Sequence, residues 1–99
     1  MKTNIQAVNF NMAERLQEYA NKKIAKLTKL SDEIANIEVF LEVVKPETAQ
    51  NKEARIKVIV PNADFFASKT CDTFEEAIDL SVEALERQLK KYKDKLAGK

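Results

Sequence analysis

The sequence lacks the residues on which most small catalytic and cofactor sites depend. Its 99 residues contain no histidine, no tryptophan, one cysteine and one glycine. Without histidine, the usual general base and the commonest zinc ligand are missing. A glycine-rich phosphate loop needs at least two glycines, and a disulfide or a cysteine metal cluster needs at least two cysteines. Carboxylate-only or metal-ion catalysis stays open in principle, but we expect no enzyme, no cofactor, no metal and no small-molecule substrate.

Long apolar runs are also missing. No stretch approaches the roughly 18 apolar residues of a membrane span, and residues 1–10 lack the apolar centre of a signal peptide. A chain that is 44% hydrophobic and 33% charged is typical of a soluble globular domain. The lone Cys71 suits a reducing compartment. We therefore expect a single domain over residues 1–99, located in the cytoplasm and without a membrane partner.

The net charge of +1 conceals a segregation of charge along the chain. Residues 1–30 carry six basic and two acidic side chains, and residues 84–99 carry the same numbers. Residues 31–83 carry five basic and twelve acidic side chains. Positive charge is thus concentrated in two segments that an acidic middle separates.

Two segments have the 3.6-residue periodicity of amphipathic helices. The first is predicted from about Met12 to Leu30, with Asn11 as N-cap and Glu14 completing the capping signature. The second begins after a cap at Asp72-Thr73 and ends near Gly98. The predicted buried positions of the two helices are Leu16, Ala20, Ile24 and Leu27, and then Phe74, Ile78, Val82, Leu85, Leu89, Tyr92 and Leu96.

Four segments have features of β-strands, and the two middle ones alternate most clearly. They are Lys2–Val8, Asn36–Lys45, Ala54–Val60 and Phe65–Cys71. Ser31–Ala35 is expected to be a polar connector, Pro46–Gln50 a break, and Pro61–Asp64 a tight turn. In the last strand it stays open which of the two alternating sets of side chains faces the core, because both Phe65 and Phe66 are bulky.

The resulting order, β-α-β-β-β-α, predicts an α+β fold with a four-stranded sheet. A right-handed crossover makes the first two strands parallel, and the rest form an antiparallel meander. The two helices then run parallel on one face of the sheet. Their basic C-terminal halves, about 60 residues apart in sequence, converge at the same end of it.

Two basic clusters are the candidate binding site. They comprise Lys22, Lys23, Lys26 and Lys29 on the first helix, and Arg87, Lys90, Lys91 and Lys95 on the second. Either cluster alone is explained by the helix dipole or by solubility. Brought together, the eight cations repel one another, and the only acids expected near the second cluster are Glu86 and Asp94. Because so few acids offset this repulsion, the two clusters together favour a polyphosphate partner.

The open face of the sheet is the alternative site. Phe40, Val44, Ile59 and Phe66 are candidates for exposure there, either for contact with a protein partner or simply to cover the sheet. The acids Glu38, Glu42, Glu47 and Glu53 lack the spacing of a calcium loop and are expected to be solvated. Cys71 is expected to be a buried apolar residue, a reactive thiol being the alternative.

Several segments resemble the ribosome hibernation promoting factor family, which includes the ribosome-associated inhibitor protein Y. The similarity extends over nearly the whole chain and is most specific in the second helix. The segments are Asn4-Ile5, Ala25-Lys26-Leu27, Phe66-Ala67-Ser68, Ala77-Ile78-Asp79, Leu85-Glu86-Arg87-Gln88-Leu89 and Lys93-Asp94-Lys95-Leu96.

This resemblance implies a fold like that of double-stranded-RNA-binding domains. It also implies binding to rRNA of the small ribosomal subunit, in the channel for mRNA and tRNA, under stress or in stationary phase. Lys23, Lys26, Arg87, Lys91 and Lys95 match basic positions of the family. Lys22 and Lys90 are added on grounds of charge.

The chain resembles the short form of the family, which lacks the second domain with which the long form pairs two ribosomes. Any pairing of ribosomes would then require a second factor. Two functions therefore remain open: an RNA-binding inhibitor of translation, and a protein-interaction module that uses the open sheet face, with helices whose basic residues only confer solubility.

Overall fold

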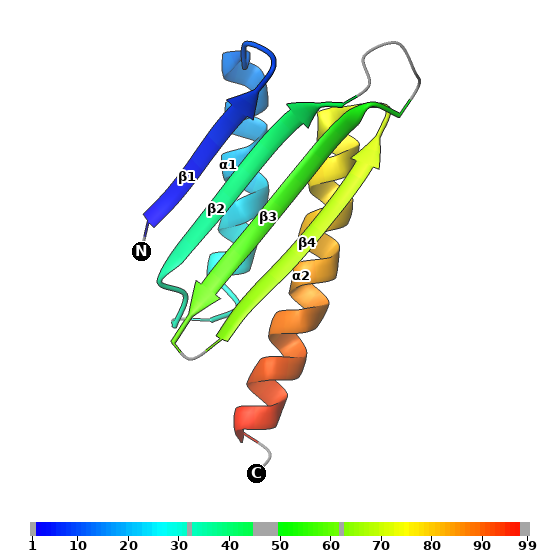
Figure 1. Cartoon of the computed structure of the whole chain (residues 1–99). Coiled ribbons are helices and arrows are strands. Elements are labelled where there is room, and N and C mark those ends of the chain that lie inside the picture. Colours follow the sequence, from blue (N-terminus) through cyan, green and yellow to red (C-terminus); the bar gives the residue numbers. More distant parts are fainter. Residues whose placement is uncertain (1, 32, 45–49, 62, 98–99) are drawn as a thin grey trace.

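The computed structural model describes residues 2–31, 33–44, 50–61 and 63–97. Six elements follow one another in the predicted order (Figure 1). They are β1 (Lys2–Val8), α1 (Glu14–Thr28), β2 (Asn36–Val43), β3 (Lys52–Val60), β4 (Ala63–Cys71) and α2 (Phe74–Ala97).

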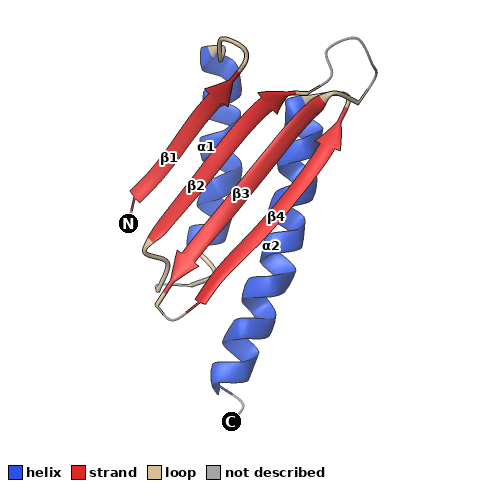
Figure 2. Ribbon diagram, in the orientation of Figure 1, coloured by secondary structure: helices blue, strands red, loops and turns tan. Residues whose placement is uncertain are grey.

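The four strands form one sheet in the order β1-β2-β3-β4. β1 pairs with β2 in parallel, whereas β2 with β3 and β3 with β4 are antiparallel. Both helices lie on the same face of this sheet and run in the same direction (Figure 2). The predicted α+β fold and its parallel helices are confirmed.

Alternation in the strands places one side of the sheet in the core. In the two central strands, the buried side chains are Ile37, Val39 and Leu41, and Ala54, Ile56, Val58 and Val60. The helices contribute their predicted apolar positions up to Leu89, which are all buried. Burial of this apolar surface is the main driving force for folding.

The structure shows which side chains of β4 face the core, a question that its two phenylalanines left open. Ala67 and Cys71 are buried, and Phe65 packs against the core with its ring 5.3 Å from that of Tyr92. Phe66 therefore points to the open face, where 55% of it is exposed. Phe40 and Ile59 lie on the same face and are half-buried.

The predicted N-cap of the first helix is wrong. α1 begins at Glu14, and Ala13 is its N-cap, without a capping side chain. The carbonyl oxygen of Ala13 accepts hydrogen bonds from the N–H groups of Leu16 and Gln17, both at 3.1 Å. The segment before the helix makes tertiary contacts instead: the ring of Phe10 stacks at 4.6 Å on that of Phe74, and Met12 packs against the core.

The cap of the second helix is confirmed for Thr73, whose Oγ1 accepts a hydrogen bond from the N–H of Glu76 at 3.1 Å. Asp72 has a different partner, because its carboxylate accepts a hydrogen bond from the backbone N–H of Gln50 at 2.9 Å. Gln50 has a φ of 54°, and this bond helps to hold it in the left-handed region.

The connector after α1 is not wholly polar, since Ile34 is buried in the core. Three boundaries also differ from the prediction. α1 ends at Thr28 rather than Leu30, and β3 begins at Lys52 rather than Ala54. β4 begins at Ala63 rather than Phe65, so that the predicted turn is shorter, because Ala63 and Asp64 already pair with β3. The predictions for Lys45, Pro46–Ala49, Asn62, Gly98 and the side chain of Leu96 lie outside the described residues.

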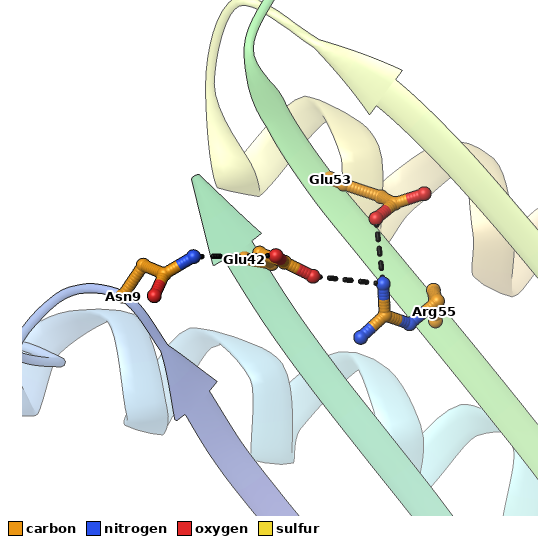
Figure 3. A network of polar contacts seen from close by, with 4 residues as sticks. All are labelled: Asn9, Glu42, Glu53 and Arg55. Carbon is orange, nitrogen blue, oxygen red and sulfur yellow. Dashed lines mark hydrogen bonds and ion pairs between the residues drawn. The ribbon is translucent and has the colours of Figure 1, made fainter. Parts of the chain in front are cut away.

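A network of polar side chains crosses the open face of the sheet (Figure 3). The Arg55 guanidinium binds Glu42 at 3.0 Å and Glu53 at 2.7 Å, and it lies over the ring of Phe40. Asn9 donates a further hydrogen bond to Glu42. The prediction that Glu42 and Glu53 are merely solvated is therefore wrong: the register of β2 and β3 brings Glu42 next to Arg55, and Glu53 lies two residues before Arg55 on the same face of β3.

Candidate nucleic-acid interface

The parallel course of α1 and α2 brings the two basic clusters into one layer, on the side of the molecule opposite the open sheet face (Figure 1). Seven of the eight predicted residues are exposed. We call Lys22, Lys26 and Lys29 the α1 flank. We call Arg87, Lys90, Lys91 and Lys95 the α2 flank.

Lys23 is the exception among the eight. Its ammonium group binds the carboxylate of Asp79 on α2 at 3.4 Å, and only 24% of its side chain is exposed. The hydrogen bond to Asp79 and the charge of that carboxylate raise the pKa of Lys23. Lys23 therefore connects the two helices, and its charge is largely compensated within the protein.

Tyr19 strengthens the same connection. Its hydroxyl group donates to the Asp79 carboxylate, with distances of 2.7 and 2.8 Å to the two oxygens. This hydrogen bond is the main reason why the pKa of Tyr19 is raised, with burial as the second. Neither role was predicted from the sequence. The predicted parallel helices could have indicated the contact, since they place the middle of α1 beside the start of α2.

A groove lies between the helices next to the contact of Lys23 with Asp79. Lys23 and Lys26 line it from α1, and Asp79, Val82, Glu83 and Glu86 line it from α2. The expectation that Glu86 and Asp94 are the only acids near the clusters is therefore wrong. It was based on the residues after position 84 and left out the turn of α2 that faces α1.

The α2 flank is held by contacts on the other side of its helix. Gln88 donates through Nε2 to the carbonyl oxygen of Phe66 at 3.2 Å, and the hydroxyl of Tyr92 donates to Glu33 at 3.4 Å. Burial raises the pKa of Tyr92, with a further contribution from the charge of Glu33. These contacts fix the rotation of α2, so that Arg87 and Lys91 point away from the core.

Other types of site find little support in the described part of the chain. Cys71 is a free, buried thiol whose pKa is raised by burial, which fits the predicted apolar role. Across residues 2–31, 33–44, 50–61 and 63–97, no three acidic or cysteine side chains are arranged to hold a metal ion. Within the same residues, neither helix combines the length and apolarity that crossing a membrane requires.

Comparison with known proteins identifies the family of this chain. Residues 3–97 match the model of the Sigma 54 modulation protein / S30EA ribosomal protein family. The chain belongs to this family. The resemblance inferred from the sequence is confirmed, and the family comprises ribosome hibernation and ribosomal subunit interface factors.

Relatives in several bacteria are similar over nearly their whole length. The ribosome hibernation promoting factor of Escherichia coli K12 is 34% identical over 96 residues, which are 97% of each chain. That of Pseudomonas putida KT2440 is 30% identical over 95 residues, 96% of this chain and 89% of the relative.

Two solved structures share the fold. A ribosomal subunit interface protein from Coxiella burnetii superposes with a TM-score of 0.83 at 27% identity, over 94% of this chain and 98% of that one. The N-terminal domain of Thermus thermophilus Protein Y superposes with a TM-score of 0.76 at 24% identity, over 91% and 94% of the two chains.

Proposed function

We propose that this protein binds rRNA of the small ribosomal subunit through the α1 and α2 flanks, occupies the channel for mRNA and tRNA, and silences translation under stress or in stationary phase. Such a role places it with the ribosomes in the cytoplasm. Membership of a family of ribosome hibernation factors supports the proposal. The details of the contact rest on the charge and geometry of the helical layer.

One observation carries the proposal: two basic segments that are distant in sequence form neighbouring parts of one exposed surface. Seven of the eight predicted cations are exposed there. Lysine and arginine side chains in such an array bind the phosphates of a nucleic acid and release its counterions. The open sheet face, by contrast, has its central arginine neutralised by Glu42 and Glu53.

The proposed mode of inhibition is based on the size of the domain. Its two shorter dimensions, 22 and 19 Å, are comparable with the width of a nucleic-acid helix. A body of this width fits a channel that accommodates tRNA. We infer that it inhibits by occupancy, so that inhibition is stoichiometric and reversible and follows mass action.

Sedimentation with purified ribosomes across a series of salt concentrations tests the proposal. If five or six phosphates are neutralised, log K falls against log salt with a slope of about −4 to −5. The protein should pellet with small subunits at low salt and leave them as salt rises. Binding that salt leaves unchanged would contradict phosphate contacts and favour a protein contact through the open sheet face around Phe66.

A further inference from the structure

The interhelical groove defined above is acidic, although it lies between two basic flanks. Two cations, Lys23 and Lys26, face three acids, Asp79, Glu83 and Glu86, so its net charge is −1. The surface that the two helices present is therefore positive, negative and positive again, rather than uniformly basic.

The three acids of the groove differ in their partners within the protein. Asp79 is bound by Lys23 and Tyr19. In the described part of the chain, by contrast, Glu83 and Glu86 form no ion pair and no hydrogen bond through their side chains. Glu83 is exposed and Glu86 is half-buried, so both carboxylates act on whatever approaches the groove.

The preference of acidic side chains for the first turn of a helix does not explain the two glutamates, and although each stands four residues before a cation, Arg87 or Lys90, neither pair lies within ion-pair distance in the described residues. Acidic side chains favour the first turn of a helix, and Glu75 and Glu76 already occupy that turn in α2. Glu83 and Glu86 lie two to three turns further on, next to the side of α1 on which Lys26 lies. Arg87 follows Glu86 directly and therefore points about 100° away around the helix, out of the groove.

We propose that Glu83 and Glu86 are specificity-determining residues, which repel phosphates from the interhelical groove. A single RNA strand that lies along the groove is then disfavoured, whatever its sequence. An RNA that presents separate phosphates to the α1 and α2 flanks at once gains both attractions and avoids the repulsion. Discrimination through an unfavourable contact with the wrong ligand is a general means of achieving specificity. This inference rests on the proposed function.

The test compares binding of purified small subunits with binding of poly(U), at one salt concentration, for the wild type and for E83Q/E86Q. One unit charge about 6 Å from a phosphate in water changes affinity roughly threefold. Removal of both charges should therefore strengthen binding to poly(U) by roughly three- to tenfold. Binding to small subunits should change less, so that the ratio of the two affinities falls.

The control is E38Q/D64N, which changes the net charge equally on the opposite face. Glu38 and Asp64 lie on the open side of β2 and β4. This variant should shift both affinities by the same small factor. The single variant E83Q, which alters only an exposed side chain, repeats the test with minimal risk to folding.

The proposal is overturned if E83Q/E86Q leaves the ratio of affinities at the control's value, or strengthens binding to both ligands equally. Failure of the proposed function has a separate signature. In that case, the wild-type protein itself does not prefer small subunits to poly(U).

Discussion

Replacement of Arg87, Lys91 and Lys95 with glutamine removes three positive charges from the α2 flank and leaves the buried side of the helix unchanged. All three side chains are exposed, and glutamine is a good helix former. The fold and its thermal unfolding midpoint should therefore be nearly unaffected, and any loss of ribosome binding reports on the surface alone.

The size of the loss follows from Coulomb's law. A unit charge about 5 Å from a phosphate in water is worth roughly a factor of four in affinity. Three such charges give a loss of roughly 60-fold if each contacts one phosphate. The salt slope should become shallower by about 2 to 3, because each contact contributes about 0.7 to 0.9 to it.

The assay is sedimentation with small subunits at several salt concentrations. The matched control replaces Lys2, Lys57 and Lys69 with glutamine, which removes the same charge from the strands. Lys57 is paired with Asp64 at 3.7 Å on the open face, and Lys2 and Lys69 are exposed on the edge strands. Its affinity should fall only a few-fold. Equal losses in the two variants would show that net charge alone governs binding, and would refute an interface on the helices.

Three further predictions concern the contact between the helices and the titration of buried groups. Tyr19→Phe removes the hydrogen bond to Asp79 and should lower the free energy of unfolding by about 1 kcal/mol. Thermal unfolding would report this as a fall in Tm of about 4–8 °C. An unchanged Tm would contradict a stabilising contact. Lys23→Gln should weaken ribosome binding less than Lys26→Gln in the same sedimentation assay, because Asp79 already compensates the charge of Lys23; an equal or greater loss would contradict this. The Tm should be nearly constant between pH 6 and 8, because the chain has no histidine to titrate there. It should fall above pH 9.0, the ordinary pKa of a thiol: the pKa of Cys71 is raised in the folded protein, so ionisation of the thiol favours the unfolded chain. Tyr19→Phe should reduce the further fall above pH 10.0, since the pKa of Tyr19 is raised as well, and a Tm that stays constant to pH 11 would contradict both assignments.

The periodic spacing of apolar residues was sufficient to predict most of the fold. The strands around Val39 and Ile56 alternate strictly because one face of the sheet is buried, and the stripe from Phe74 to Leu89 repeats every 3.6 residues because one side of α2 is buried. The handedness of the crossover then determined that the helices are parallel. Local rules and tertiary structure agree in these elements.

Two of the incorrect or missed predictions have a common physical cause, which is contact between residues far apart in the chain. Asn11 has the local signature of an N-cap, but the stacking of Phe10 on Phe74, 64 positions away, is associated with a later start of the helix. The position of Asp79 beside Lys23 depends on how α1 packs against α2. Such contacts depend on the register of packed elements, which a single sequence does not specify.

The candidate site was chosen from charge and spacing, which did not predict how its side chains are arranged. Charge and spacing indicated all eight cations, and the structure shows seven of them exposed. The compensation of Lys23 and the acids that separate the two flanks became visible only with the relative rotation of the helices. Glu83, for example, reads in the sequence as one more surface charge.

Competition on purified small subunits tests most directly whether this protein occupies the channel for mRNA and tRNA. Fluorescently labelled initiator tRNA would be bound with mRNA, and the protein titrated in at low salt. We predict mutually exclusive binding: the protein displaces tRNA at stoichiometric amounts, excess tRNA and mRNA release the protein, and R87Q/K91Q/K95Q competes poorly. Simultaneous binding of tRNA and the protein, without any mutual effect on affinity, would contradict occlusion of the channel.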